Sequence, residues 1–258
     1  MKVVIWAGGL GSRISEESHL VPKPMIEIGG MPIIWHIMKH YSYYGHNDFI
    51  LCLGYKQFVV REFFANYSYY TSDILIDVKN NEIQMQNDLS EPWRIYLVNT
   101  GLNTGKAGRL NKVRKYLDNE PFAVTYGDGV SNVDINESIR FHKAHGKTAT
   151  ITAVNLPQMK GVLSIEQDGS LKSFREKGKQ DATLINGGYM ILNPDVFSYI
   201  DQENDIMEFE DEPMNNLYNA DEIRAYYHDG FWQCMDTQRE KLYLEKLWNE
   251  GNPGWKIW

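Results

Sequence analysis

The sequence predicts an α/β protein whose Rossmann-like, mostly parallel mixed sheet is flanked by helices. Two observations favour this fold class. Short apolar runs alternate with amphipathic stretches over residues 1–146, and strand-like runs dominate after residue 146. Strands that alternate with helices form βαβ units, whose parallel strands gather ligands at their carboxyl ends. The later runs predict β-rich additions to this core.

The elements of the first half follow one another in a regular order. Strands are expected at 2–6, 48–54, 93–101 and 122–129, and helices at 31–45, 57–67, 108–117 and 134–146. In the first of these helices, apolar side chains recur on one face. Pro32 suits its first turn and Gly45 suits its end.

Three further elements are expected outside this alternation. Two strand-like runs joined by "KNNE" predict a hairpin at about 73–86, inserted into the α/β core. "QDGS", residues 167–170, predicts a second hairpin turn in the β-rich stretch. A helical pattern over 236–251 predicts a last helix near the end of the chain.

Composition excludes several classes of function. The chain has 258 residues and a net charge of −8, which argues against broad binding to nucleic acid or to an anionic membrane. Its two cysteines, Cys52 and Cys234, lie far apart without metal-like spacing, as is typical of reduced thiols in a cytoplasmic protein. No apolar run approaches 18 residues and the first strand follows Met1 at once, so we expect no signal peptide and no membrane span.

The stretch "AGGLGSRISEESHLVPKP", residues 7–24, directly follows the first expected strand. It is not a dinucleotide fingerprint, because the third glycine position is Ile14, and the chain contains no P-loop. Glycines nevertheless allow backbone N–H groups to approach a phosphate closely. Candidate phosphate-binding residues are Gly8, Gly9 and Gly11, the hydroxyl of Ser12 and the guanidinium of Arg13.

Lys23 lies between Pro22 and Pro24. Proline fixes its own φ, and Pro24 also favours an extended backbone at the residue before it. We therefore expect the ammonium of Lys23 to be held in one place. The alternative is that "GGLG" is a tight turn and "PKP" a solvent-facing bend.

The loop "AGGLGSR" followed by "PKP" resembles the sugar nucleotidyltransferases, the nucleoside-diphosphate-sugar pyrophosphorylases. Further stretches, among them "TYGDGV", "INGGYMILNP" and "GFWQCMDTQREKLYLEKLW", are similar to its glucose-1-phosphate cytidylyltransferase branch. The similarity covers essentially the whole chain. It implies a core that carries CTP, Mg²⁺ and a hexose 1-phosphate and forms CDP-glucose and pyrophosphate. A role in the synthesis of surface polysaccharide, such as O-antigen, is also implied.

The resemblance also implies how the chain is divided. Residues 1–258 would form one nucleotidyltransferase domain. Within it, 1–146 would bind the nucleotide, 147–235 would bind the sugar phosphate, and 236–258 would form a C-terminal helix and tail.

Individual residues are matched to roles by this resemblance. The nucleotide-binding positions are Ala7, Gly8, Gly9, Gly11, Ser12, Arg13, Thr104, Arg109 and Gly127. The sugar-phosphate positions are Glu176, Lys177, Asn186 and Gly187. Arg13 and Lys23 match the catalytic positions, and Asp128 and Asp236 match the metal-binding aspartates.

Three of these residues have other readings. Asp236 begins the last expected helix, where aspartate commonly serves as the N-cap, and Asp128 lies between two glycines in a turn. Arg109 follows a loop and would then lie on the exposed face of a helix. For the two aspartates, the resemblance favours the metal.

The implied reaction needs no general base. A phosphate monoester loses its second proton at a pKa of about 6, so the attacking oxygen is already ionised near neutral pH. The site must align two polyanions and neutralise their charge, which calls for cations and backbone donors.

Three departures from the family pattern concern the acceptor. Gly178 replaces the proline after Glu176-Lys177, Cys234 replaces a proline before "MDT", and Lys106 stands in "GKAGR" where the branch usually has T-G-G-R. Two alternatives therefore stay open: the same chemistry with another sugar 1-phosphate or small phosphorylated acceptor, and a catalytically silent nucleotide-sugar-binding homologue. We also expect a homo-oligomer, with the hairpin at 73–86 and the C-terminal "NPGWKIW" as candidate contacts.

Overall fold

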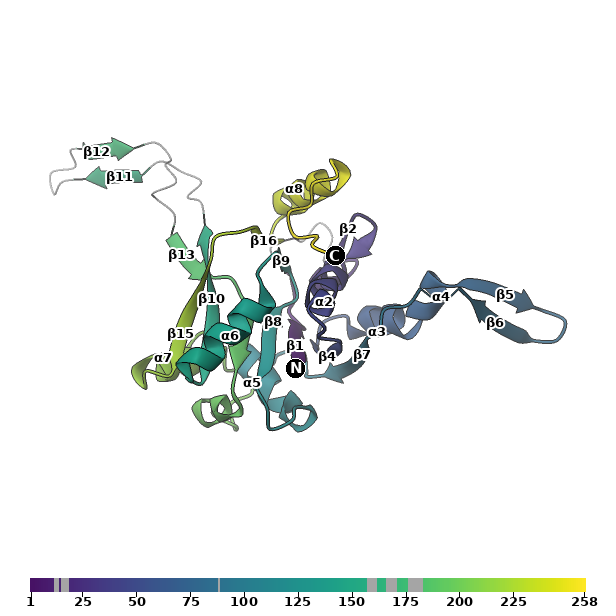
Figure 1. The fold of residues 1–258 in the computed structure, drawn as a ribbon, viewed down its shortest axis with the longest axis horizontal. Coiled ribbons are helices and arrows are strands. Elements are labelled where there is room, and N and C mark those ends of the chain that lie inside the picture. Colours follow the sequence, from purple (N-terminus) through teal and green to yellow (C-terminus); the bar gives the residue numbers. More distant parts are fainter. Residues whose placement is uncertain (12–13, 15–18, 88, 157–161, 166–170, 176–182) are drawn as a thin grey trace.

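The protein is built around a central eight-stranded sheet (Figure 1). The structure is a computed structural model, and it describes residues 1–258 except 12–13, 15–18, 88, 157–161, 166–170 and 176–182. The parallel part of the sheet has the strand order β8-β1-β4-β7. These strands are β1 (Lys2–Ala7), β4 (Asp48–Leu53), β7 (Arg94–Asn99) and β8 (Phe122–Tyr126). Each lies within three residues of its expected bounds, and the predicted parallel core is confirmed.

The other half of the sheet is mixed. Strand β14 (Met190–Leu192) is antiparallel to β8, and β10 (Ala149–Leu156) is antiparallel to β14. The end of β10 pairs with β13 (Thr183–Asn186) in the antiparallel sense, and β15 (Ile223–His228) runs parallel to β10. The strands from the first half of the chain are thus parallel, and the second half of the chain is rich in strands, as predicted.

Helices cover both faces of the sheet. Side chains alternate between the faces of a strand, and in β1 Val3 and Ile5 pack on the side of α2 (Ile33–Tyr43). Val4 and Trp6 pack on the opposite side, against α5 (Lys106–Val113). A strand covered on both faces requires a continuous apolar run, which explains why "VVIW" reads as a buried strand.

The helix predicted at 31–45 begins later than expected. Met31–Pro32 form the short strand β3, which pairs with β2 (Glu27–Ile28), so Pro32 is the residue before the helix rather than part of its first turn. Gly45, with φ of +83°, follows the helix end as predicted. The helix expected at 57–67 is divided into α3 (Gln57–Ala65) and α4 (Tyr67–Thr71).

The remaining predicted helices agree more closely with the structure. Helix α5 is followed by the 3₁₀ turn η3 (Arg114–Tyr116), and together they fill the range expected at 108–117. Helix α6 (Ile135–His145) has Asp134 as its N-cap and Gly146, with φ of +65°, at its end. Helix α8 (Gln238–Asn249) lies within the range expected at 236–251.

The hairpin predicted at 73–86 is confirmed. It consists of β5 (Asp73–Asp77) and β6 (Glu82–Gln86), and in Figure 1 it extends away from the sheet beyond α4. A second antiparallel pair is formed by β11 (Val162–Ile165) and β12 (Leu171–Arg175). The turn predicted at 167–170 lies outside the described residues.

Several elements of the second half have no individual counterpart in the prediction. They include strand β15, the 3₁₀ segment η5 (Pro194–Tyr199) and helix α7 (Glu212–Asn219). The C-terminal tail also differs from expectation, because Trp255 is buried against His36 and Trp248 of its own chain. Among the described residues, no helix combines the length and the apolar character needed to cross a membrane.

Candidate active site

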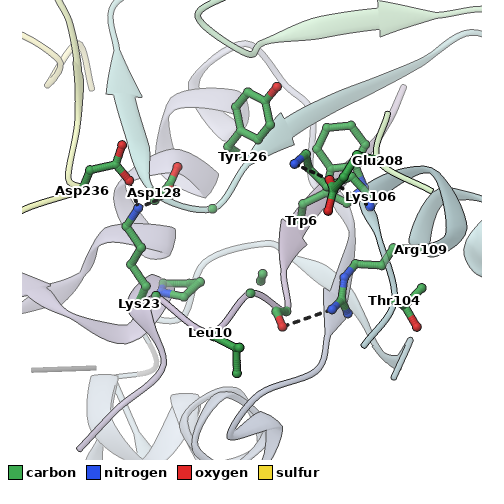
Figure 2. Close-up of a pocket in the computed structure, with 16 residues that line it drawn as sticks. Trp6, Leu10, Lys23, Thr104, Lys106, Arg109, Tyr126, Asp128, Glu208 and Asp236 are labelled. Atoms are coloured by element: carbon green, nitrogen blue, oxygen red, sulfur yellow. Dashed lines mark hydrogen bonds and ion pairs between the residues drawn. The ribbon is translucent and has the colours of Figure 1, made fainter. Parts of the chain in front are cut away.

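A cavity of about 470 Å³ lies at the carboxyl edge of the parallel strands, where ligands of such sheets collect (Figure 2). It is lined by Trp6, Ala7, Gly8, Gly9, Leu10, Gly11, Lys23, Pro24, Thr104, Lys106, Arg109, Tyr126, Gly127, Asp128, Glu208 and Asp236. Ten of the residues predicted from the sequence are among them: Ala7, Gly8, Gly9, Gly11, Lys23, Thr104, Arg109, Gly127, Asp128 and Asp236. Ser12, Arg13, Glu176 and Lys177 lie outside the described residues.

The glycines of the first loop differ in what surrounds them. A Cβ on Gly8 would lie 2.2 Å from Nη1 of Arg109, so packing requires glycine there. A Cβ on Gly9 would face open space, and Gly11 has φ of +64°, in the left-handed region. The loop thus combines one packed glycine, one that leaves room beside the cavity and one in the left-handed conformation.

Arg109 is buried beneath this loop, with 4% of its surface exposed. Its guanidinium donates to the carbonyl oxygens of Gly8 at 3.2 Å, Leu53 at 3.2 Å and Gly101 at 2.9 Å. It also donates to Oγ1 of Thr100 at 2.6 Å. The reading that places Arg109 on an exposed helix face is therefore wrong, because α5 turns this side chain toward the strand ends.

Lys23 lies on the opposite side of the cavity, between two carboxylates (Figure 2). Its ammonium is 2.6 Å from Oδ2 of Asp128 and also contacts Oδ1 of Asp236. Burial lowers the pKa of Lys23, but the charges and hydrogen bonds of the two aspartates outweigh burial and raise it. Lys23 is therefore a held cation, as predicted.

The backbone of Lys23 differs from the prediction. It is the first residue of a 3₁₀ turn, η2 (Lys23–Met25), rather than an extended residue. The turn is closed by hydrogen bonds from Met25 N to Pro22 O at 2.8 Å and from Ile26 N to Lys23 O at 3.1 Å. The extended conformation falls on Pro22 instead, whose ψ is 146°.

A short ladder explains why Asp128 and Asp236 meet. Strand β9 (Gly129–Ser131), directly after Asp128, pairs with β16 (Trp232–Cys234), and Met235 N donates to Asp128 O at 2.9 Å. The N-cap of α8 is Thr237, whose side chain and Glu240 form a capping box. Asp236 is therefore not the cap, and its carboxylate is directed to Lys23.

Lys106 is balanced by its own carboxylates. It pairs with Glu208 at 2.5 Å and with Glu210 at 3.1 Å. Glu210 also accepts a hydrogen bond from the hydroxyl of Tyr126 at 2.5 Å. The charge that this departure adds to the pocket wall is thus neutralised within the chain.

Comparison with known proteins identifies the family. The profile of the family described as nucleotidyl transferase matches residues 2–241. The glucose-1-phosphate cytidylyltransferase of Salmonella typhi is 51% identical over 259 residues, with 100% of each chain covered. The chain belongs to the nucleotidyl transferase family. A probable glucose-1-phosphate cytidylyltransferase of Bacillus subtilis is 42% identical over 258 residues, again with 100% of each chain covered.

Solved structures share the fold of this nucleotidyl transferase. HddC from Yersinia pseudotuberculosis, complexed with GMP-PN, gives a TM-score of 0.67 at 22% identity, covering 96% of this chain and 99% of that one. A UDP-glucose pyrophosphorylase complexed with UDP-glucose gives 0.68 at 17% identity, covering 97% and 99%. The predicted fold class is therefore confirmed.

The donor set of the nucleotidyl transferase site fits a divalent cation that also binds phosphate. Among the described residues, no cluster of three or more histidine, cysteine or acidic side chains could hold a metal alone. Asp128 and Asp236, however, direct two carboxylates to one point. Mg²⁺ typically takes one or two carboxylates and completes its shell with water and substrate phosphate.

Two of the predicted sugar-side residues, Asn186 and Gly187, lie just beyond this cavity. Asn186 ends β13, and its Nδ2 donates to the hydroxyl of Tyr126 at 3.2 Å. Gly187 donates to Thr152 O at 2.8 Å and accepts a hydrogen bond from Nε1 of Trp232 at 2.8 Å. Tyr126 thus separates the cavity from the strand on which Asn186 lies.

Sequence reasoning missed several residues of the pocket wall, among them Tyr126 and Glu208. Tyr126 had a usable signal, because it ends a buried strand directly before Gly127-Asp128, at the edge where ligands collect. Glu208 had none, since it lies in the acidic stretch "ENDIMEFEDE", where any carboxylate reads as solvated.

Proposed function

We propose that this nucleotidyl transferase moves a cytidylyl group from CTP to α-D-glucose 1-phosphate, giving CDP-glucose and pyrophosphate. The observation that carries the proposal is Lys23 between Asp128 and Asp236, facing the glycine loop across one cavity. Relatives with full-length matches are named for this activity. The direct test is release of pyrophosphate from CTP, Mg²⁺ and glucose 1-phosphate by the purified protein.

The proposed chemistry is an in-line displacement. A phosphate oxygen of glucose 1-phosphate forms a bond to the α-phosphorus of CTP, and the bond from this phosphorus to the bridging oxygen breaks. Pyrophosphate leaves with that electron pair. The attacking oxygen is ionised near neutral pH, and the residues that line the described cavity include no histidine to act as a base.

The chain's own residues align and neutralise the phosphates. The backbone N–H groups of Gly8, Gly9 and Gly11 would donate hydrogen bonds to phosphate oxygens. The guanidinium of Arg109 donates to the carbonyl oxygen of Gly8 and so supports this loop. Lys23 supplies a positive charge at the opposite wall. Enzymes usually accelerate phosphoryl transfer by stabilising the charge that develops in the transition state. Arg13, by the family match, adds a second cation.

Asp128 and Asp236 would hold Mg²⁺. When bound, Mg²⁺ supplies positive charge that offsets the phosphates and lowers the repulsion between the two substrates. The ammonium of Lys23 lies between these carboxylates, which supports the proposal that they bind a cation. With a divalent cation on the aspartates, the charge of Lys23 becomes available to the phosphates.

The acceptor would lie beside Asn186 and Gly187, with Glu176 and Lys177 assigned to it by the family match. If the departures at Gly178 and Lys106 reshape this side, sugar choice would loosen while nucleotide choice stays strict. A site that bonds the amine of cytosine loses buried hydrogen bonds when uracil enters, whereas water can replace a lost bond to one hydroxyl. A panel of nucleotides and a panel of hexose 1-phosphates measure the two ratios.

The panels also separate the alternatives. Turnover with a different sugar 1-phosphate but not with glucose 1-phosphate would favour another acceptor. Binding of CDP-glucose without turnover of any donor and acceptor would favour a catalytically silent homologue. The intact set of Lys23, Asp128 and Asp236 favours the enzyme, because a silent homologue has no physical reason to keep it.

We also propose that the protein is a cytoplasmic homo-oligomer. The apolar side chains of the hairpin β5–β6 are exposed, with Leu75 at 52%, Ile76 at 60% and Ile83 at 56%. An isolated two-stranded hairpin is at best marginally stable, so burial against a second copy would stabilise it. Light scattering measures the mass, and Ile76→Lys would lower it if the hairpin forms the contact.

A further inference from the structure

A continuous polar chain connects the nucleotide side of the cavity with strand β13. Lys106 pairs with Glu210 at 3.1 Å, and Glu210 accepts from the hydroxyl of Tyr126 at 2.5 Å. The same hydroxyl oxygen lies 3.2 Å from Nδ2 of Asn186. Three elements far apart in the sequence, at residues 106, 126 and 186, are thereby joined to the segment that precedes α7.

The donors and acceptors of this chain have only one consistent direction. Gly188 N donates to Oδ1 of Asn186 at 3.0 Å, which fixes the orientation of the amide and leaves Nδ2 facing Tyr126. The carboxylate of Glu210 can only accept, so the single hydroxyl proton of Tyr126 goes to Glu210. Tyr126 must then accept from Asn186.

This arrangement leaves one N–H of Asn186 without a partner among the described residues, and so open to a ligand. The amide carries two N–H donors, and Tyr126 receives one of them. The backbone that follows is a glycine bend, in which Gly188 has φ of +78°. Gly188 N holds Oδ1 of Asn186 and the hydroxyl of Tyr126 holds Nδ2, so the two contacts together direct the amide toward the cavity wall.

We propose that Tyr126 is a positioning residue that fixes the amide of Asn186 for the acceptor sugar phosphate, an inference that rests on the proposed function. Tyr126 lines the cavity and precedes Gly127-Asp128, so it connects the metal-binding turn to the sugar side. Glu210 holds Tyr126, and Lys106 neutralises Glu210. Lys106, which departs from the family pattern, is thereby linked to the acceptor site through Glu210 and Tyr126.

The test measures KM and kcat for each substrate in Tyr126→Phe. Removing the hydroxyl leaves the amide of Asn186 held at Oδ1 alone, so KM for glucose 1-phosphate rises roughly fivefold while KM for CTP stays within about twofold. Glu210→Leu, which removes the acceptor, reproduces this pattern. Glu210→Gln keeps an acceptor oxygen and restores KM for glucose 1-phosphate to within about twofold of the wild type.

A matched control is Tyr116→Phe. Tyr116 lies at the opposite edge of the sheet, where its carbonyl accepts from Lys2 at the start of β1, so its hydroxyl does not touch the cavity. Neither KM changes in this variant. Unchanged KM for glucose 1-phosphate in Tyr126→Phe, or an equal rise for both substrates, would overturn the inference.

Calorimetry with CDP-glucose separates this inference from the proposed function. A wild-type protein that lacks turnover but binds CDP-glucose more tightly than Tyr126→Phe overturns the enzyme and supports the positioning role. A wild-type protein that turns over normally, with Tyr126→Phe identical to it, overturns the positioning role alone. A protein that neither reacts nor binds CDP-glucose overturns both.

Discussion

The ammonium of Lys23 lies 2.6 Å from Oδ2 of Asp128 and is shared with Asp236. One cation thus balances two carboxylates that come from opposite halves of the chain. Because the aspartates raise the pKa of Lys23 despite its burial, this group stays charged throughout the neutral range. The three side chains act as one unit, and changing any of them unbalances the others.

Asp128→Asn and Asp236→Asn are each expected to lower kcat by about 10²–10³ while the fold survives. Each change removes a charge that would hold the proposed Mg²⁺, but Asp128 lies in a turn and Asp236 precedes the cap of α8, so neither supports the core. Pyrophosphate release measures activity and thermal unfolding measures the fold. Asp118→Asn, which touches only Lys2 at the opposite edge, is the control. Near-normal turnover in either variant at saturating Mg²⁺ would remove that residue from the site.

Lys23→Ala is expected to lower kcat by about 10²–10³ while the affinity for CTP changes much less. The ammonium is held at one point, and the proposed function assigns it to the charge that develops between the α-phosphorus and the leaving pyrophosphate. Single-turnover rates and a CTP titration separate the two effects. Lys39→Ala, which removes a lysine paired with Glu91 away from the cavity, leaves both unchanged. Lost CTP binding with a normal rate at saturation would make Lys23 a binding residue only.

Lys106→Met is expected to raise KM for CTP roughly fivefold. Without Lys106, Glu208 and Glu210 leave uncompensated negative charge beside a site for polyanions. The effect should shrink as the salt concentration rises, because salt screens exposed charges. Lys147→Met is a close control, since Lys147 also lies between two carboxylates, Asp221 and Glu222, but far from the cavity. Equal KM values in the two variants would contradict the prediction.

The sequence predicts the core well because its signals are local. The apolar runs of β1, β4 and β8 are buried on both faces, and such runs carry their own length and position. Helix α7 was not predicted from such a local signal. Only Pro213 and Leu217 of its residues are buried, and its eight residues are too short a stretch for their apolar spacing to be recognised from the sequence.

The candidate site shows the same limit. Motif spacing places Lys23, Asp128 and Asp236 at one edge, and the spacing from Thr237 to Glu240 is a local capping-box signal for Thr237 that the sequence reasoning did not use. Arg109 has no such signal, since its burial depends on carbonyl groups from β4 and from the loops after β1 and β7. Contacts of this kind form between segments that are distant in the sequence, so the local sequence pattern around a residue does not predict them.

His36 gives the protein a predictable acid sensitivity. It is fully buried, its Nε2 contacts the carbonyl of Ile28 at 2.8 Å, and Nε1 of Trp255 lies 3.3 Å from its Nδ1. Trp255 can only donate, so Nδ1 accepts and the ring is neutral with its proton on Nε2. Burial, with a smaller effect of Lys256, lowers the pKa of His36 to about 4.

The free energy of unfolding should therefore fall as the pH drops from about 6.5 to about 4. Between these two pH values, His36 binds a proton in the unfolded chain but not in the folded protein. The contribution of neutral His36 to the free energy of unfolding is therefore complete above its ordinary pKa of 6.5, and it is lost as the pH falls to its pKa of about 4 in the folded protein. The loss is roughly 2 kcal/mol at pH 5. Protonation of Nδ1 would also break the bond to Trp255, so tryptophan fluorescence should report loosening of the C-terminal tail. Urea unfolding at several pH values measures the slope, which His36→Gln should reduce, and an equal slope in both proteins would show that His36 is not the group responsible.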